Sequence, residues 1–147
     1  MVAAAGSGKY SYGDPGATVR SGTGLVKKTT APKRVLVIED HIDSARSLAF
    51  LLADMGHEVE YAINGYVGLD IALRFLPDFV LLDIGLPGMD GFEVCRRIKR
   101  KPALEGVRVI AVTAWAQEEY RARSKEVGCE LHLVKPVPVP VLEELLG

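Results

Sequence analysis

The sequence has little cysteine and no long apolar run, and each shortage excludes a class of protein. Its two cysteines, Cys95 and Cys129, lack the spacing of a metal site, which favours reduced thiols in a cytoplasmic protein. No apolar stretch approaches the roughly 18 residues that a membrane span needs. The first residues contain neither a basic segment nor an apolar core, so the sequence shows no secretory signal.

The sequence also has no large excess of positive or negative charge. The formal net charge is −1, which gives no reason to expect direct binding to nucleic acid or to a membrane surface. What remains is ordinary for a folded chain: 147 residues, 48% of them hydrophobic and 25% charged. This length predicts one domain with a core that needs no disulfide or metal for support.

Residues 1–32 differ in composition from the rest of the chain. They contain six of the fifteen glycines, scattered serine and threonine, and no periodic apolar pattern. Such a segment buries too little apolar surface to offset the entropy lost on ordering. We therefore expect a flexible, glycine-rich, basic tail or linker over residues 1–32 and one domain over residues 33–147.

One stretch of the domain places an acid at a position where ligands bind. Residues 79–82 are all apolar, as in a parallel strand that is covered on both faces, and Asp83 follows directly. The next eight residues, 84–91, contain three glycines and a proline, which is typical of a loop. The carboxyl ends of parallel strands are the ligand-binding edge of open α/β sheets, so Asp83 is a candidate nucleophile or metal ligand.

Strands and helices alternate along the rest of the domain. This alternation predicts a parallel sheet with right-handed crossovers and with helices on both faces. The expected strands are residues 35–38, 58–62, 79–82, 107–112 and 131–134; the expected helices are residues 43–55, 64–75, 90–101, 117–127 and a short one that begins at Pro140.

Polar side chains follow four of these strands, and parallel strands bring them to one edge. They are Glu39, Asp40, Asp83, Thr113 and Lys135. Three converging carboxylates repel one another unless a cation joins them, and an all-oxygen set suits Mg²⁺. A metal and a lysine would neutralise a phosphoryl group, a hydroxyl would position it, and Asp83 would be free to accept it.

The order of these residues resembles the receiver domain of two-component response regulators, including the chemotaxis regulators. The resemblance lies in Glu39-Asp40, in the sequence LLDIGLPGMDG around Asp83, in Thr113-Ala114 and in Lys135-Pro136, and it covers residues 33–147. It implies a flavodoxin-like (βα)5 fold with a five-stranded parallel sheet in the strand order 2-1-3-4-5.

The resemblance also implies the roles of the acidic residues. Asp83 corresponds to the phosphoacceptor of the family. Glu39, Asp40 and Asp83 correspond to its Mg²⁺ site, which the main-chain carbonyl of Gly85 would complete.

Three further positions take roles from the same resemblance. Thr113 corresponds to the hydroxyl that closes on the phosphoryl group, and Lys135 to its counter-ion. The Lys135–Pro136 peptide bond is expected to be cis. The family usually has Tyr or Phe at the position of His132, where an aromatic ring reports activation, so Thr113 and His132 are the expected switch pair.

The function implied is a signalling module rather than an enzyme with metabolic turnover. A histidine kinase or a histidine phosphotransfer protein would donate a phosphoryl group to Asp83, and the altered surface would change binding to a downstream protein target. The domain would catalyse only its own phosphorylation and dephosphorylation. Whether it acts as a free-standing protein or as the C-terminal segment of a hybrid sensor kinase stays open.

Two other functions fit the residues less well. An aspartate-nucleophile phosphatase needs a second Asp two residues after the nucleophile, and here that position is Gly85. A flavodoxin-type cofactor binder needs a phosphate-binding loop after its first strand. Residues 40–43 are acidic at two of four positions and would repel a phosphate.

We also predict the environment of several residues outside this set. His41 and His57 are interpreted as solvated loop residues, Trp115 as a residue at the rim of the site, and Cys95 and Cys129 as packing residues. The short last helix is expected to leave Val139, Leu142 or Leu146 partly uncovered, which would favour a weak homodimer.

Overall fold

A five-stranded parallel sheet runs through the part of the chain that the computed structural model describes, residues 28–147. Its strands are β2 (Arg34–Ile38), β3 (Glu58–Ala62), β4 (Phe79–Leu82), β5 (Arg108–Thr113) and β6 (Leu131–Val134). They lie in the order β3-β2-β4-β5-β6, and all four neighbouring pairs are parallel. Among these strands the spatial order is therefore 2-1-3-4-5, which confirms the predicted topology.

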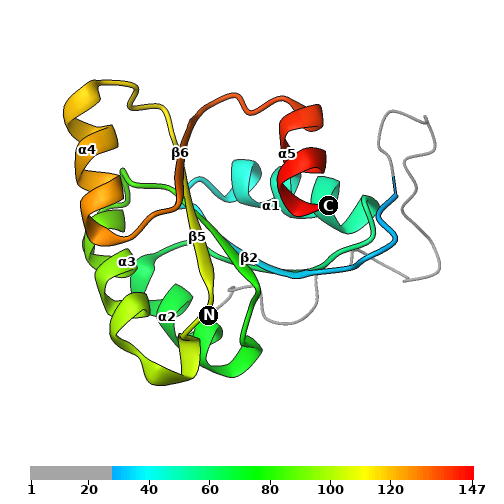
Figure 1. The fold of residues 1–147 in the computed structure, drawn as a ribbon, viewed down its shortest axis with the longest axis horizontal. Helices are drawn as coiled ribbons and strands as arrows, with labels where there is room; N and C mark the ends of the chain where they lie inside the picture. The colour runs from blue at the N-terminus through cyan, green and yellow to red at the C-terminus, as the bar shows by residue number, and fades with distance from the viewer. Residues whose placement is uncertain (1–27) are drawn as a thin grey trace.

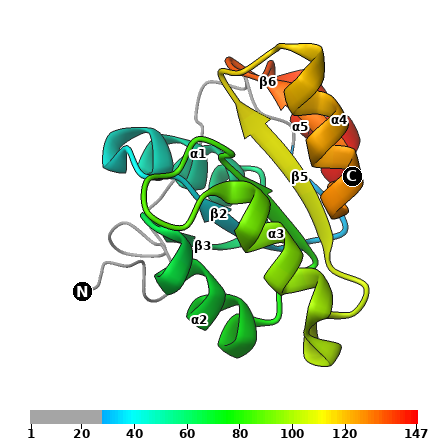
Figure 2. The same cartoon turned by 90° about the vertical axis from the view of Figure 1, so that its left-hand side faces the viewer.

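Helices cover both faces of this sheet, as predicted (Figures 1 and 2). The helices are α1 (Ile42–Asp54), α2 (Gly65–Phe75), α3 (Gly91–Arg100), α4 (Glu118–Val127) and α5 (Val139–Leu146), with a short 3-10 helix at Pro102–Leu104. Residues of α1 and α5 share one apolar cluster with the sheet, and residues of α2, α3 and α4 share the other. None of the helices within residues 28–147 is both long and apolar enough to cross a membrane.

The apolar runs of the inner strands follow from this layered arrangement. In β2, Leu36 and Ile38 belong to the cluster under α2 and α3, whereas Val35 and Val37 belong to the cluster under α1 and α5. Successive side chains of a strand point to opposite faces, so a strand covered on both sides needs apolar residues at every position. The same reasoning applies to β4, whose four residues are all buried.

Local capping signals determine where two helices begin. The side chain of Asn64 accepts a hydrogen bond from the Val67 amide at 2.8 Å, and that of Asp90 accepts one from the Glu93 amide at 3.0 Å. Each satisfies a main-chain donor that the first turn of a helix leaves unpaired. The start of α3 thereby fixes the end of the loop that follows Asp83.

The last helix covers the sheet better than its length suggested. Leu142 and Leu146 are each only 1% exposed, so of the three residues named in the expectation of a partly uncovered side chain, Val139 alone is partly exposed. The two leucines lie in the apolar cluster that includes Leu81 and Val112, because their spacing of four residues places them on one face of α5. Val139 is half-buried, and Val141, on the outer side, is 37% exposed.

One prediction was wrong, because His57 is buried rather than solvated. It is 5% exposed, and its Nδ1 accepts a hydrogen bond from the Lys33 amide at 3.0 Å. Its Nε2 is buried and has no hydrogen-bond partner among residues 28–147. Burial lowers the pKa of His57, and the nearby charge of Lys33 lowers it further. The folded protein therefore favours the neutral ring.

Most of the expected tail, residues 1–27, lies outside the described residues. Within residues 28–32, Thr29 contacts the domain at two points. Its amide donates to the carbonyl of Met55 at 2.8 Å, and its hydroxyl donates to the carbonyl of Gly147 at 2.7 Å. The boundary at residue 33 stays a prediction.

Candidate functional site

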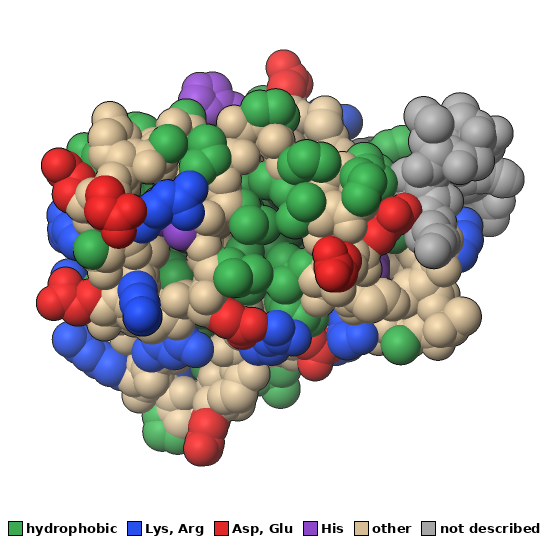
Figure 3. Space-filling model, turned by 45° about the horizontal axis from the view of Figure 1, so that its top comes forward, with side chains coloured by type: hydrophobic (Ala, Val, Ile, Leu, Met, Phe, Trp, Pro, Cys, Tyr) green, Lys and Arg blue, Asp and Glu red, His purple; other side chains and the backbone are tan. Residues whose placement is uncertain are grey.

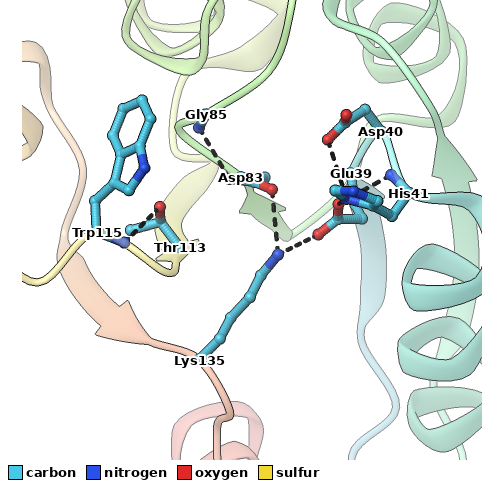
Figure 4. Close-up of polar contacts among 8 residues, drawn as sticks. All are labelled: Glu39, Asp40, His41, Asp83, Gly85, Thr113, Trp115 and Lys135. Atoms are coloured by element: carbon cyan, nitrogen blue, oxygen red, sulfur yellow. Dashed lines mark hydrogen bonds and ion pairs between the residues drawn. The ribbon is translucent and has the colours of Figure 1, made fainter.

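The carboxyl ends of four strands bring the candidate site residues together at one edge of the sheet (Figure 4). Glu39 and Asp40 follow β2, Asp83 follows β4, Thr113 ends β5 and Lys135 follows β6. Main-chain hydrogen bonds continue the sheet to these positions, from the Asp83 amide to Ile38 and from the Lys135 amide to Thr113, both at 2.9 Å. The side chains that follow are thus held on a rigid frame.

The Lys135 ammonium links two of the carboxylates. Its Nζ lies 3.1 Å from Oδ2 of Asp83 and also makes a hydrogen bond with Oε1 of Glu39. The second carboxylate oxygen of Asp83, Oδ1, accepts a hydrogen bond from the Gly85 amide at 2.9 Å. Both oxygens of Asp83 are therefore held by donors, in an orientation that places the carboxylate in the site.

Burial dominates the electrostatics of Asp83, which is 9% exposed. Desolvation raises the pKa of this carboxyl, and the charge of Glu39 raises it further; the Gly85 amide and Lys135 act in the opposite direction without reversing the shift. The carboxylate is thus less stabilised by its surroundings than one in water. An additional cation beside it would favour the charged form.

Lys135 keeps its charge despite partial burial. Desolvation acts to lower its pKa, but the hydrogen bond to Glu39 and the charge of Asp83 outweigh it, so the pKa of Lys135 is raised. The ammonium remains charged across the physiological pH range and is available to neutralise an anion at the strand ends.

Acidic ligand atoms gather next to Lys135 in a form that a divalent cation could use. One ligand atom each of Glu39, Asp40 and His41 lies within 4.8 Å of the other two. Carboxylate oxygens are the ligands that Mg²⁺ prefers, and part of Asp40 is open to solvent, which leaves room for the metal's water ligands. The two carboxylates of this group suit a hard divalent ion, whereas Asp83, which was also predicted as a ligand, does not belong to the group.

His41 was not predicted to belong to this group of possible metal ligands. Its side chain is 76% exposed, as expected for a solvated loop residue. Its main-chain amide donates to Oε2 of Glu39 at 3.0 Å, and Nδ1 lies 3.2 Å from the same oxygen and 3.6 Å from Oδ1 of Asp40. The signal available in the sequence was its position directly after Glu39-Asp40, at the end of the first strand.

Thr113 and His132 lie at the two ends of a short chain of contacts. The Thr113 hydroxyl, on a residue that is 1% exposed, accepts a hydrogen bond from the Trp115 amide at 3.2 Å. The Trp115 carbonyl lies 2.8 Å from Nε2 of His132, and Nδ1 of His132 lies 2.8 Å from the Ser124 hydroxyl in α4. The loop after β5 is thus connected to both β6 and α4.

Three other expectations concern single features. The Lys135–Pro136 peptide bond is cis in the structure. Trp115 is 38% exposed and lies beside Gly85, at the edge of the site. Cys95 and Cys129 are free and buried, with sulfur atoms 3.6 Å apart, as packing residues would be.

The fold and the strand-end residues define a class of protein: a doubly wound α/β domain with an acidic site and a lysine at its carboxyl edge. Residues 35–146 match the family model of the response regulator receiver domain. The chain belongs to this family, whose members are signalling modules of two-component systems that interact with histidine kinases and downstream targets. This membership favours the signalling module over the phosphatase and the flavodoxin-type binder.

Individual relatives agree with the family match. The chain is 37% identical over 109 residues to the polar-differentiation response regulator DivK of Brucella anthropi, covering 74% of this chain and 89% of DivK. It is 38% identical over 104 residues to the response regulator PleD of Caulobacter vibrioides, covering 71% of this chain but 23% of PleD. The chemotaxis protein CheY4 of Vibrio cholerae superposes with a TM-score of 0.74 at 28% identity, covering 79% of this chain and 97% of CheY4.

Proposed function

We propose that this chain accepts a phosphoryl group from a phosphohistidine onto Asp83, and that the reaction requires Mg²⁺. The observation that carries the proposal is the position of Asp83 at the end of β4, with the Lys135 ammonium 3.1 Å from one oxygen and the Gly85 amide 2.9 Å from the other. The donor would be a histidine kinase or a histidine phosphotransfer protein.

In the proposed reaction, an oxygen of Asp83 forms a bond to phosphorus as the bond between phosphorus and the histidine nitrogen breaks. Lys135 neutralises oxygens of the transferred group, and the Thr113 hydroxyl donates a hydrogen bond to it. A divalent ion held by Glu39, Asp40, Asp83 and the carbonyl of Gly85 would supply further positive charge. The protein contributes to the reaction by holding these groups in position, since phosphoryl transfer relies on positioning and electrostatics.

The response to phosphorylation would pass through the loop after β5. If Thr113 turns its hydroxyl toward the phosphoryl group, it gives up the hydrogen bond from the Trp115 amide. The carbonyl of Trp115 is bound to His132, which is bound to Ser124 in α4. Thr113 and His132 would therefore act as the switch that changes the surface presented to a downstream protein target.

A weak homodimer is a further part of the proposal. Figure 3 shows apolar side chains gathered in the middle of one face. Separately, β6 and α5 each have an exposed apolar residue, Leu131 at 42% and Val141 at 37%. Apolar side chains that share one face favour self-association when they lie close together. Sedimentation of the phosphorylated and unphosphorylated protein over a range of concentrations would detect it, and a strict monomer in both states would contradict it.

The requirement for a metal gives the proposed function a direct test. The protein is incubated with acetyl phosphate, once with Mg²⁺ and once with a chelator, and its intact mass is measured. We expect a phosphoryl adduct with Mg²⁺ and little without it, because the carboxylates and the incoming phosphoryl group repel one another. Equal adduct formation in both samples, or no adduct in either, would contradict the proposal.

A further inference from the structure

Cys95 and Cys129 are the only two cysteines of the chain, and the fold brings their sulfur atoms into contact. Cys95 lies in α3, and Cys129 follows Gly128, the residue that caps the end of α4. The two are 34 residues apart in the sequence, yet their Sγ atoms lie 3.6 Å from each other. A disulfide bond is about 2.05 Å long, so the sulfur atoms need to approach by only about 1.5 Å.

Hydrogen bonds hold both cysteines at the junction of the two helices. The amide of Cys129 donates to the Ser124 carbonyl at 2.8 Å, a bond that closes the end of α4. The Cys95 thiol donates to the carbonyl of Val127 at 3.4 Å, and the Cys129 thiol donates to the Cys95 sulfur. The two sulfur atoms therefore meet in a defined arrangement at the C-terminal end of α4.

The surroundings make the two thiols chemically different. The hydrogen bond from Cys129 lowers the pKa of the Cys95 thiol, although burial opposes this effect. The nearby charges of Lys99 and Arg96 lower the pKa of Cys95 further. The same hydrogen bond and burial raise the pKa of Cys129. Because the thiolate is the form that reacts with an oxidant, Cys95 is placed to react first and Cys129 to complete the bond.

Burial limits which oxidants can reach this pair. Cys95 is fully buried, and Cys129 is 6% exposed. Val127, whose carbonyl accepts the Cys95 thiol, also lines a surface hollow between α3 and α4. A small oxidant in this hollow lies within one residue of the pair. Hydrogen peroxide is small enough to complete the path, whereas a bulky thiol reagent is not.

We propose that Cys95 and Cys129 form a reversible disulfide that fastens α4 to α3 when the protein meets a peroxide. The Cys95 thiolate attacks one oxygen of hydrogen peroxide, the bond between the two oxygens breaks, and the hydroxide that leaves takes up a proton to become water. The Cys129 sulfur then bonds to the Cys95 sulfur as the bond from that sulfur to oxygen breaks, and a second water leaves. Two thiols thus lose two electrons and two protons, and one peroxide is reduced to two waters.

The disulfide would restrain a helix that also contacts the residues around Thr113. Ser124 of α4 is hydrogen-bonded to His132, and the ring of Tyr120 in α4 lies 4.6 Å from that of Trp115. A covalent bond at the end of α4 opposes local opening of this helix. The proposal goes beyond phosphoryl transfer and does not depend on it, because no residue of the strand-end site takes part in the oxidation.

Mass and thiol measurements on the full chain test the disulfide. The folded protein is treated with hydrogen peroxide, and its intact mass and its free thiols after denaturation are measured before and after addition of a dithiol reductant. We expect loss of two hydrogen atoms and of both free thiols, a peptide that links Cys95 to Cys129, and full recovery on reduction. Two free thiols after treatment, a gain of oxygen without a cross-link, or a cross-link between two chains would each overturn the proposal.

Two further measurements show whether the bond fastens α4 without strain. A disulfide constrains the unfolded chain, so the thermal midpoint of the oxidised protein should rise by roughly 5–10 °C over that of the reduced protein. Hydrogen exchange of the α4 amides should slow as well. A lower midpoint, or unchanged exchange in α4, would contradict the proposal.

Cys129→Ser is the matched control, because it keeps the size of the side chain and removes one sulfur. After the same peroxide treatment it should show neither the rise in midpoint nor the slower exchange. The same two changes in Cys129→Ser would show that they do not arise from the disulfide. The comparison of oxidised with reduced wild type carries the test if the variant does not fold.

Discussion

The Nζ atom of Lys135 lies 3.1 Å from Oδ2 of Asp83 although 52 residues separate them in the sequence. Lys135 follows β6 and Asp83 follows β4, so the long lysine side chain reaches past the end of β5, which lies between them. The same ammonium contacts Glu39 at the end of β2. One cation thus joins acids from two strands, and its positive charge is what the oxygens of a transferred phosphoryl group require.

Removing this charge should impair phosphorylation while leaving the fold intact. Lys135→Met keeps the length of the side chain without the ammonium, and we expect the rate of adduct formation to fall roughly a hundredfold, as when a single stabilising group is lost from an active site. The rate is measured by intact mass at several times after addition of acetyl phosphate. Lys135→Arg, which retains the charge, should lose less; equal rates in wild type and Lys135→Met would contradict a role for Lys135.

We predict that position 91 requires glycine, because the start of α3 lies very close to the main chain that follows β4. A Cβ there would lie 2.5 Å from Cα of Ile84 and 2.6 Å from the carbonyl oxygen of Asp83, and main-chain atoms have little freedom to move aside. Gly91→Ala should therefore lower the free energy of unfolding and disturb Asp83, with slower adduct formation.

Gly68→Ala is the matched control for this substitution. Its Cβ would lie 2.6 Å from Cδ1 and 3.0 Å from Cγ1 of Ile38, which are side-chain atoms rather than main-chain atoms. We expect a cost of about 1–3 kcal/mol in stability, typical of an overpacked core, with adduct formation unchanged. Denaturant unfolding and intact mass, applied to both variants, would refute the argument if Gly91→Ala proved the milder of the two.

The buried His57 predicts a loss of stability at acidic pH. Its pKa is lowered in the folded protein from an ordinary value of 6.5, so the unfolded chain binds the proton more readily. Stability is therefore greatest above about pH 6.5 and is lost as the pH falls below it, toward the pKa of the folded state. Denaturant unfolding between about pH 8 and about pH 5 should show a weaker pH dependence for His57→Gln than for wild type. Parallel curves would show that His57 does not contribute.

The contacts of Thr29 predict that two truncations of the chain differ. A protein that begins at Lys28 keeps the hydrogen bonds from Thr29 to Met55 and Gly147, whereas one that begins at Lys33 loses both. We expect the shorter protein to be less stable by about 1–2 kcal/mol, and the longer one to match the full chain. Thermal midpoints of the three proteins provide the measurement. Equal midpoints would show that residues 28–32 contribute nothing.

The sequence predicted the alternating strands and the converging residues because both depend on short-range patterns and on the geometry of parallel sheets. The strand order was implied only by the resemblance to the receiver family. Asn64 and Asp90 mark helix starts within three residues, and Asp83 is marked by its apolar strand. The burial of His57 was missed because it depends on Lys33, which is distant in the sequence. The contact between Trp115 and Gly85 depends on the paths of two loops, which no local pattern specifies.

The most direct test of the central assignment compares wild type with Asp83→Asn. Asparagine has nearly the same shape as aspartate but cannot act as the acceptor carboxylate, and circular dichroism would verify that the variant is folded. Both proteins are incubated with acetyl phosphate and Mg²⁺, and their intact masses are measured. If Asp83 is the phosphoacceptor, wild type gains a phosphoryl group and the variant gains none; an adduct of equal yield in the folded variant would contradict the assignment.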